Sequence, residues 1–146
     1  GGGHEFGLRP GTLPVPHIVG FGAAARVAIR DLKKRRAKCE RVRERFLDFI
    51  GEIGGLINGD PSRSVPHIAN ISIPGLDAEA AIVALKQVIA VSNGSACTSS
   101  SYEPSHVLTA MALPDDRVHS AIRFSWCHLT DEIDWADVTN SIRPFL

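Results

Sequence analysis

The amino-acid sequence predicts an α/β fold, a three-stranded sheet with flanking helices. Three observations lead to this prediction. Residues 17–53 repeat apolar side chains at helical spacing, residues 67–73 and 120–126 alternate as strands do, and helix-capping signals precede further helical stretches. A chain of 146 residues is long enough to bury the core of one such domain.

The first part of the chain predicts a loop followed by a long helix. Residues 1–16 are rich in glycine and proline, which favours a loop. A helix is expected from about His17 to about Ile53, because apolar side chains spaced three, four and seven positions apart share one helical face. These side chains are Leu32, Cys39, Val42, Phe46, Phe49 and Ile50.

The middle of the chain predicts strand, helix and strand. Residues 54–66 are turn-rich, and the alternation at 67–73 ends at Pro74-Gly75. Asp77 is expected to cap a helix that runs to about Val88. A short strand, Ile89–Ser92, is then expected to lead into a loop over residues 92–103.

The last part predicts two more helices around the third strand. Pro104 suits the first turn of a helix that ends at Met111, and residues 112–116 are expected to form a turn. The strand at 120–126 follows. Thr130 is expected to cap a last helix, whose buried stripe would be Trp135, Val138 and Ile142.

Composition limits the function classes. The formal net charge is zero, so bulk charge does not point to nucleic acid or membrane, and no apolar run approaches the ~20 residues of a membrane helix. Three cysteines in 146 residues fit a reducing, cytoplasmic compartment. The chain does not begin with Met, which suggests a fragment whose upstream part is missing.

One stretch of the helix is strongly basic. Arg26–Arg45 holds ten of the sixteen Lys and Arg residues and three acids. We favour the solvated face of an amphipathic helix, with a docking surface for an acidic protein partner as a further possibility. A nucleic-acid patch is the third alternative.

The three cysteines predict three different environments. Cys97 lies in SNGSACTSSS, which offers no apolar wall, so we expect an exposed, reactive thiol rather than a buried structural one. Cys39 falls on the apolar stripe of the long helix, so we expect it in the core. Cys127 with His128 could be half of a metal site, but no second pair of ligands follows zinc spacing, so packing at the strand edge is favoured.

Arg123 lies in the middle of a predicted strand. Its side chain is expected on the face opposite Ile122 and Phe124. It could pair with a buried carboxylate of the protein, or it could grip a carboxylate or phosphate ligand with its planar fork. The residues alone leave both possibilities open.

Four motifs in order resemble the C-terminal part of pyridoxal-phosphate-dependent cysteine desulfurases with a long cysteine loop. They are GGGHEFGLRPGTLPVPHIVG, NISIPGLDAEA, VSNGSACTSSSYEPSHVL and HSAIRFSWCHLTDEID. The resemblance implies the small C-terminal domain of the aspartate-aminotransferase fold type. Residues 1–16 would be an active-site loop between domains, and residues 17–146 the small domain with the loop at 92–103. No Ser-x-His-Lys occurs, so the domain with the cofactor lysine is expected to be absent from this chain.

The resemblance also implies site residues and a reaction. Cys97 would attack the sulfur of L-cysteine, leaving L-alanine and a persulfide that passes to an acceptor protein. Thr12 would hold the phosphate of pyridoxal phosphate, although a turn residue bonded to its own backbone is the alternative. Arg123 would hold the substrate carboxylate, which favours the ligand over the buried pair. His4 and Glu5 match residues near the active-site entrance and dimer contact.

The resemblance leaves the pathway and the assembly open. Trp126-Cys127-His128 looks like the desulfurases that serve DNA phosphorothioation, whereas other members serve iron–sulfur cluster assembly. The expected partners are L-cysteine, a sulfur acceptor, and either a homodimer of the full-length enzyme or a companion large-domain chain. The fragment alone is expected to be inactive. The alternative function is a stand-alone persulfide relay, while membrane association and direct nucleic-acid binding are not expected.

Overall fold

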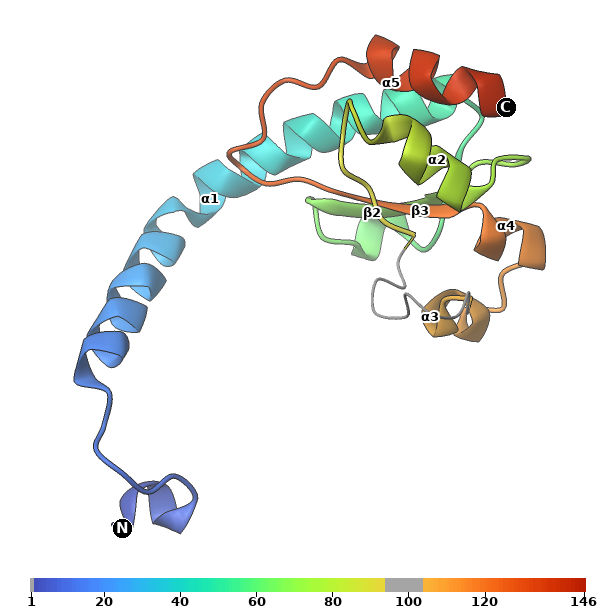
Figure 1. Cartoon of the computed structure of the whole chain (residues 1–146). Coiled ribbons are helices and arrows are strands. Elements are labelled where there is room, and N and C mark those ends of the chain that lie inside the picture. The colour runs from blue at the N-terminus through green and yellow to red at the C-terminus, as the bar shows by residue number, and fades with distance from the viewer. Residues whose placement is uncertain (1, 94–103) are drawn as a thin grey trace. The chain divides into compact units, whose positions relative to one another are not determined.

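The computed structural model describes residues 2–93 and 104–146 (Figure 1). The chain divides into two compact units, Gly1–Lys34 and Arg35–Leu146. The second unit contains a three-stranded antiparallel sheet with helices, so the predicted α/β class is confirmed. Within the described residues, none of the helices is both long enough and apolar enough to cross a membrane.

The first unit contains more regular structure than the predicted loop. A 3-10 helix occupies His4–Gly7, and the long helix α1, Val15–Glu52, begins two residues earlier than expected. Pro16 suits this first turn because the first helical N–H groups have no intrahelical partner. Before it, the guanidinium of Arg9 donates to the carbonyls of Gly11 and Thr12 at 3.1 and 3.0 Å, which fixes the connecting turn.

The core of the second unit forms where the second half of α1 meets the sheet. Four members of the predicted stripe are buried, whereas Leu32 is 62% exposed and lies in the first unit. The ring of Phe46 is fully buried, with ring centroids of Phe124 and Trp126 at 5.1 and 5.3 Å. The four buried members are Cys39, Phe46, Phe49 and Ile50.

The sheet has the expected number of strands but one strand differs. Strands β2 (Ile68–Ser72) and β3 (Ala121–Ser125) lie where strands were predicted and pair with each other, and β1 (Leu56–Ile57) pairs with the other edge of β2. The strand predicted at Ile89–Ser92 was wrong, because only Ser92 pairs, through an isolated bridge to β3. The side chains of Ile89 and Val91 pack against the core instead.

The helices around the sheet confirm one predicted cap and correct another. Helix α2, Ala78–Leu85, is capped by Asp77 as expected, and its carboxylate accepts from two backbone N–H groups. Helix α5, Trp135–Ile142, is capped by Asp134 and not by Thr130. The Thr130 hydroxyl accepts from the Cys127 backbone N–H at 2.9 Å and is therefore already occupied.

Two short helices follow the undescribed segment. Helix α3, His106–Ala110, lies inside the predicted helix. Helix α4, Asp115–His119, begins inside the turn expected at residues 112–116 and was not predicted, because its five residues are too few to show a helical repeat in the sequence. The expectation for residues 94–103 lies outside the described residues.

The two faces of the sheet have different chemistry. The second half of α1, with α2 and α5, covers one face (Figure 1), where Ala69, Ile71, Ile122 and Phe124 are buried. Side chains alternate across a strand, so the other face carries Asn70, Ser72, Arg123 and Ser125. The polar face is where the candidate site lies.

Candidate functional site

Polar side chains form a row across the sheet. Asn70 of β2 lies directly opposite Arg123 of β3, and Ser92 bridges to the other side of Arg123. Asn58 follows β1 and its backbone N–H donates to the Asn70 carbonyl at 2.8 Å. Directly opposite residues share a face. We call these four residues, Asn58, Asn70, Arg123 and Ser92, the polar row.

Arg123 is the charged member of the polar row. Its side chain is exposed while Ile122 and Phe124 beside it are buried, so the predicted orientation is confirmed. In the part of the chain that the structure describes, its guanidinium makes no ion pair and no hydrogen bond. The buried protein carboxylate that the sequence allowed is therefore not found there, and the planar fork is available to a ligand.

Ser92 is joined to Arg123 by two backbone hydrogen bonds. The Ser92 N–H donates to the Arg123 carbonyl at 3.2 Å, and the Arg123 N–H donates to the Ser92 carbonyl at 2.6 Å. Ser92 is the first residue of the predicted loop 92–103. Cys97 itself lies outside the described residues.

A hydrogen-bonded network supports the other end of the row. The Asn58 amide nitrogen donates to the Asn70 side-chain oxygen and to the Ser72 hydroxyl, both at 2.7 Å. Arg117 of α4 donates to the Asn58 side-chain oxygen at 2.5 Å and to the Ile57 carbonyl at 3.0 Å. Ser72 in turn donates to the Arg117 carbonyl at 2.6 Å. The network ties β1, β2 and α4 together.

Sequence reasoning missed Asn58, Asn70 and Arg117. The alternation of residues 67–73 could have indicated that Asn70 points away from the core. Its position opposite Arg123 needed the register between strands about fifty residues apart, which no local pattern contains.

Thr12 lies in the first unit and its side chain is exposed. Only its carbonyl is engaged, by Arg9 at 3.0 Å. Within residues 2–93 and 104–146, its hydroxyl has no hydrogen-bond partner, so the alternative of a hydroxyl bonded to its own backbone is not found. A free hydroxyl is a chemically suitable donor to a phosphate oxygen.

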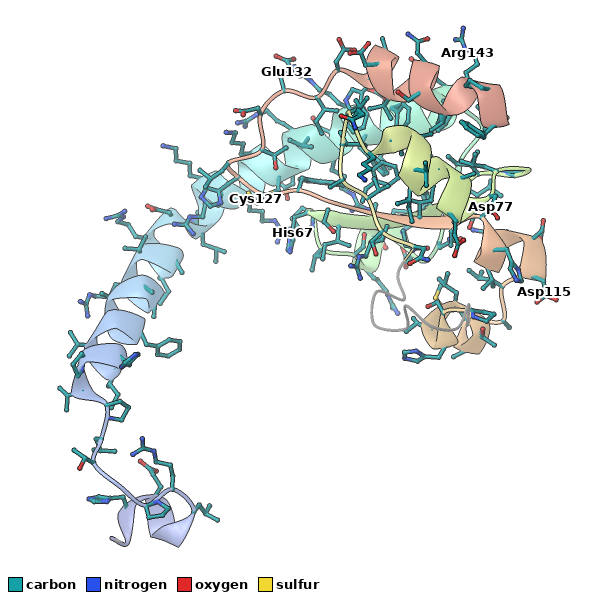
Figure 2. All side chains as sticks on the ribbon, viewed as in Figure 1. His67, Asp77, Asp115, Cys127, Glu132 and Arg143 are labelled. Carbon is teal, nitrogen blue, oxygen red and sulfur yellow. The ribbon has the colours of Figure 1, made fainter. Side chains whose placement is uncertain are left out.

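The two described cysteines differ in exposure. Cys39 is buried as predicted, burial raises the pKa of its thiol, and its carbonyl accepts from the Trp126 indole at 3.0 Å. Cys127 is exposed rather than packed, which corrects the prediction (Figure 2). The Leu129 backbone N–H donates to its sulfur at 3.3 Å, and this bond lowers the pKa of the Cys127 thiol.

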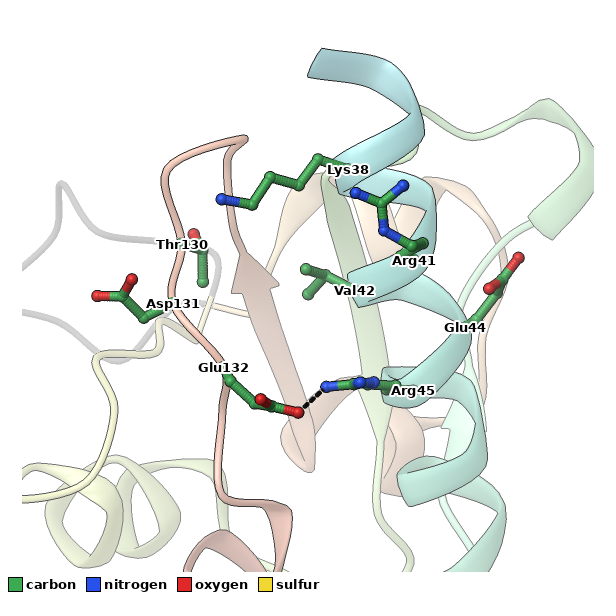
Figure 3. A pocket seen from close by; sticks show the side chains of 8 residues that line it. All are labelled: Lys38, Arg41, Val42, Glu44, Arg45, Thr130, Asp131 and Glu132. Carbon is green, nitrogen blue, oxygen red and sulfur yellow. Dashed lines mark hydrogen bonds and ion pairs between the residues drawn. The ribbon is translucent and has the colours of Figure 1, made fainter. Parts of the chain in front are cut away.

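Two other features of the second unit bear on the predictions. Among the described residues, no group of three His, Cys, Asp or Glu side chains could hold a metal ion. A groove of about 420 Å³ lies between α1 and the segment after β3 (Figure 3). Arg45 and Glu132 form an ion pair across it. Its lining has three cations and three acids, so it has no net charge: Lys38, Arg41, Val42, Glu44, Arg45, Thr130, Asp131 and Glu132.

The sequence and the fold match a known class of proteins. Residues 3–136 match the family model described as Aminotransferase class-V, and the chain therefore belongs to this family. Pyridoxal phosphate is the cofactor that this family implies.

Within the family, the similar curated proteins are cysteine desulfurases, as the motifs predicted. The chain is 48% identical over 139 residues to Cysteine desulfurase IscS of Vibrio vulnificus (strain YJ016), covering 93% of this chain and 34% of that protein. It is 46% identical over 147 residues to Cysteine desulfurase IscS of Enterobacter sp. (strain 638), covering 97% and 36%. The chain thus spans about a third of the length of these relatives.

Solved structures agree with the sequence relatives. DndA from Streptomyces lividans superposes with a TM-score of 0.65 and 38% identity, covering 87% of this chain and 36% of that one. A NifS-like protein superposes with a TM-score of 0.72 and 27% identity, covering 99% and 36%. The expected aminotransferase-like fold and the expected family are confirmed.

Proposed function

We propose that this chain is the C-terminal part of a cysteine desulfurase that takes sulfur from L-cysteine. The observation that supports the proposal most strongly is the guanidinium of Arg123, which has no partner among the described residues and lies in the strand bonded to Ser92, five positions before Cys97 in the sequence. The reaction requires two groups from this chain, one that binds the substrate carboxylate and a thiol nucleophile.

Arg123 is the proposed substrate-binding residue. A guanidinium presents two parallel N–H groups that match the two oxygens of a carboxylate. Both backbone hydrogen-bonding groups of Arg123 bond to Ser92, and on its other side Arg123 lies directly opposite Asn70 of β2, so its position is well fixed. This anchoring favours binding of an amino-acid carboxylate in one place.

Cys97 is the proposed sulfur acceptor. Its thiolate forms a bond to the substrate sulfur while the bond from that sulfur to the substrate carbon breaks. The carbon keeps the electron pair, takes up a proton and leaves as L-alanine, and Cys97 keeps the persulfide. Cys97 follows Ser92 by five positions, so the length of the chain limits the distance between their Cα atoms to at most about 18 Å.

This chain would supply only some of the residues that bind the cofactor. Pyridoxal phosphate, when bound, supplies the electron sink for cleavage of the carbon–sulfur bond. Thr12 would donate its hydroxyl to the cofactor phosphate. The anchoring lysine would come from the rest of a longer protein or from a companion chain, since no Ser-x-His-Lys occurs here. By itself, this chain would have no desulfurase activity.

The downstream partner is a sulfur-acceptor protein. The Trp126-Cys127-His128 ending favours a role in DNA phosphorothioation, and the resemblance of the other motifs favours iron–sulfur cluster assembly. For either role we expect a cytoplasmic enzyme that acts as a homodimer or with a companion large-domain chain. Because this sequence contains no Ser-x-His-Lys, a second candidate function is a persulfide relay domain without its own cofactor chemistry.

Replacement of Cys97 tests the proposal. In an enzyme that combines this chain with the cofactor-lysine part, Cys97→Ser should abolish sulfur transfer from L-cysteine, because the hydroxyl cannot hold a persulfide. Cys127→Ser is the matched control, since its thiol is exposed but lies outside the proposed site, and it should keep the wild-type rate. Wild-type transfer by Cys97→Ser would falsify the proposal.

A relay domain predicts another outcome. This chain alone would then accept a persulfide from a separate donor on Cys97 and pass it on. Mixing it with a separate large-domain chain would not be needed for that transfer. Activity that appears only after mixing supports the desulfurase instead.

A further inference from the structure

The side chain of Asn70 is held in one orientation by a chain of hydrogen bonds. Arg117 can only donate, so the Asn58 oxygen faces it at 2.5 Å. The Asn58 nitrogen therefore faces Asn70 and donates to its side-chain oxygen at 2.7 Å. A rotated Asn70 amide would place two NH₂ groups against each other. The guanidinium of Arg117 thus fixes which end of the Asn70 amide is engaged.

The free end of Asn70 is a hydrogen-bond donor. In residues 2–93 and 104–146, its NH₂ group donates to no acceptor. Asn70 pairs directly with Arg123, and directly opposite residues of antiparallel strands have Cβ atoms about 4.5–5.5 Å apart. The polar face therefore presents a neutral donor next to a cationic one.

We propose that Asn70 is a substrate-binding residue that donates to the same carboxylate as Arg123. This inference rests on the proposed function of Arg123 and adds a second contact. The guanidinium fork alone permits a carboxylate to slide or tilt in its plane, whereas a third donor from the neighbouring strand selects one orientation. The ligand class is an α-amino acid, whose carboxylate would accept hydrogen bonds from Asn70 and Arg123 together, while Asn58 holds the Asn70 amide in place.

A purely structural role for Asn70 makes a different prediction. Its oxygen could serve only to attach β1 to β2 through Asn58. Asn70→Asp separates the two roles, because the aspartate keeps an acceptor for the Asn58 nitrogen. At the same time it replaces the free NH₂ group with a negatively charged oxygen that repels a carboxylate.

The experiment compares two competitive ligands in the enzyme that combines this chain with the cofactor-lysine part. L-Alanine carries the carboxylate, and ethylamine is the same amine without it. For Asn70→Asp, we expect the KM for L-cysteine and the Ki for L-alanine to rise about tenfold or more, because a charge-assisted hydrogen bond is lost. The Ki for ethylamine should change less than twofold, and kcat should change less than KM.

A second variant leaves Asn70 in place. In Asn58→Asp, the new carboxylate can only accept hydrogen bonds, from Arg117 on one side and from Asn70 on the other. The Asn70 amide should therefore rotate so that its NH₂ group faces the carboxylate and its oxygen faces the ligand. The same selective loss of L-alanine binding is expected. Asn140→Asp is the control, an exposed amide on α5 with the same change of charge, and it should leave both constants unchanged.

Three results would overturn the inference. Asn70→Asp could leave the L-alanine constant unchanged, it could weaken both ligands equally, or Asn58→Asp could have no effect. Arg123→Ala keeps this failure distinct from that of the proposed function. If Arg123→Ala weakens L-alanine and the asparagine variants do not, only the role of Asn70 is wrong. If Arg123→Ala has no effect, the carboxylate site itself is wrong.

Discussion

At the scale of single residues, position in the strand decides what each polar side chain can do. Arg123 could be placed from the sequence, because its neighbours Ile122 and Phe124 alternate with it and are buried. Asn70 could not, since its role depends on its partner in another strand. The prediction that Cys127 packs at the strand edge was wrong. A residue at the end of a strand can face solvent as easily as the core, and local sequence does not distinguish the two.

Arg123→Lys should weaken binding of L-cysteine although the charge is retained. An ammonium group cannot make two parallel bonds to a carboxylate. We expect the KM for L-cysteine to rise about tenfold, with a smaller change in kcat, measured by steady-state kinetics of the combined enzyme. Arg143→Lys, remote from the polar row at the end of α5, is the control. An unchanged KM in Arg123→Lys would argue against a two-pronged contact.

Cys127 and Cys39 should react with iodoacetamide at very different rates. The N–H donor from Leu129 lowers the pKa of Cys127, so a larger thiolate fraction is present at any pH below an ordinary thiol's pKa. Its rate should therefore reach half its maximum at a lower pH than that of a free thiol, and fall as pH decreases further. Burial raises the pKa of Cys39, which should stay unmodified until the protein unfolds. Mass spectrometry of the labelled peptides measures both rates.

At the scale of elements, length decides what the sequence reveals. The long helix α1 and the five-residue strands β2 and β3 were predicted because their repeats are long enough to see. The two-residue strand β1 and the five-residue helix α4 carry no repeat, so their existence depends on contacts made after folding.

Asp134→Ala should destabilise the protein by about 0.5–2 kcal/mol, the usual cost of a lost helix cap. Its carboxylate accepts from the Ala136 and Asp137 N–H groups at 3.0 and 3.2 Å. Asp131→Ala is the matched control in the same connection, and its free energy of unfolding should change by less than about 0.5 kcal/mol. Equal losses in a urea titration would show that Asp134 does not act as the cap.

At the scale of the whole molecule, the second unit is organised around Phe46. The helix stripe that contains it was predicted, but its aromatic partners come from β3 and α5, far along the chain. The core holds the second half of α1, with α2 and α5, on one face of the sheet, which leaves the other face to the polar row. This division is what makes the polar face available for chemistry.

Phe46→Ala should cost about 3–5 kcal/mol of unfolding free energy, since it removes a fully buried ring and leaves a cavity. Phe21→Ala is the contrasting variant, because that ring is 78% exposed in α1, and its cost should stay below about 0.5 kcal/mol. Both can be measured by urea denaturation of this chain. Similar losses for the two rings would contradict the assigned core.

The central claim is that Cys97 receives the sulfur of L-cysteine at a site that Arg123 defines. The most direct measurement is peptide mass spectrometry after the combined enzyme has been incubated with L-cysteine and its persulfides have been trapped by alkylation. The peptide that contains Cys97 should gain the mass of one sulfur atom, and Arg123→Ala should reduce this gain. Extra sulfur found on Cys127 or Cys39, with none on Cys97, would contradict the claim.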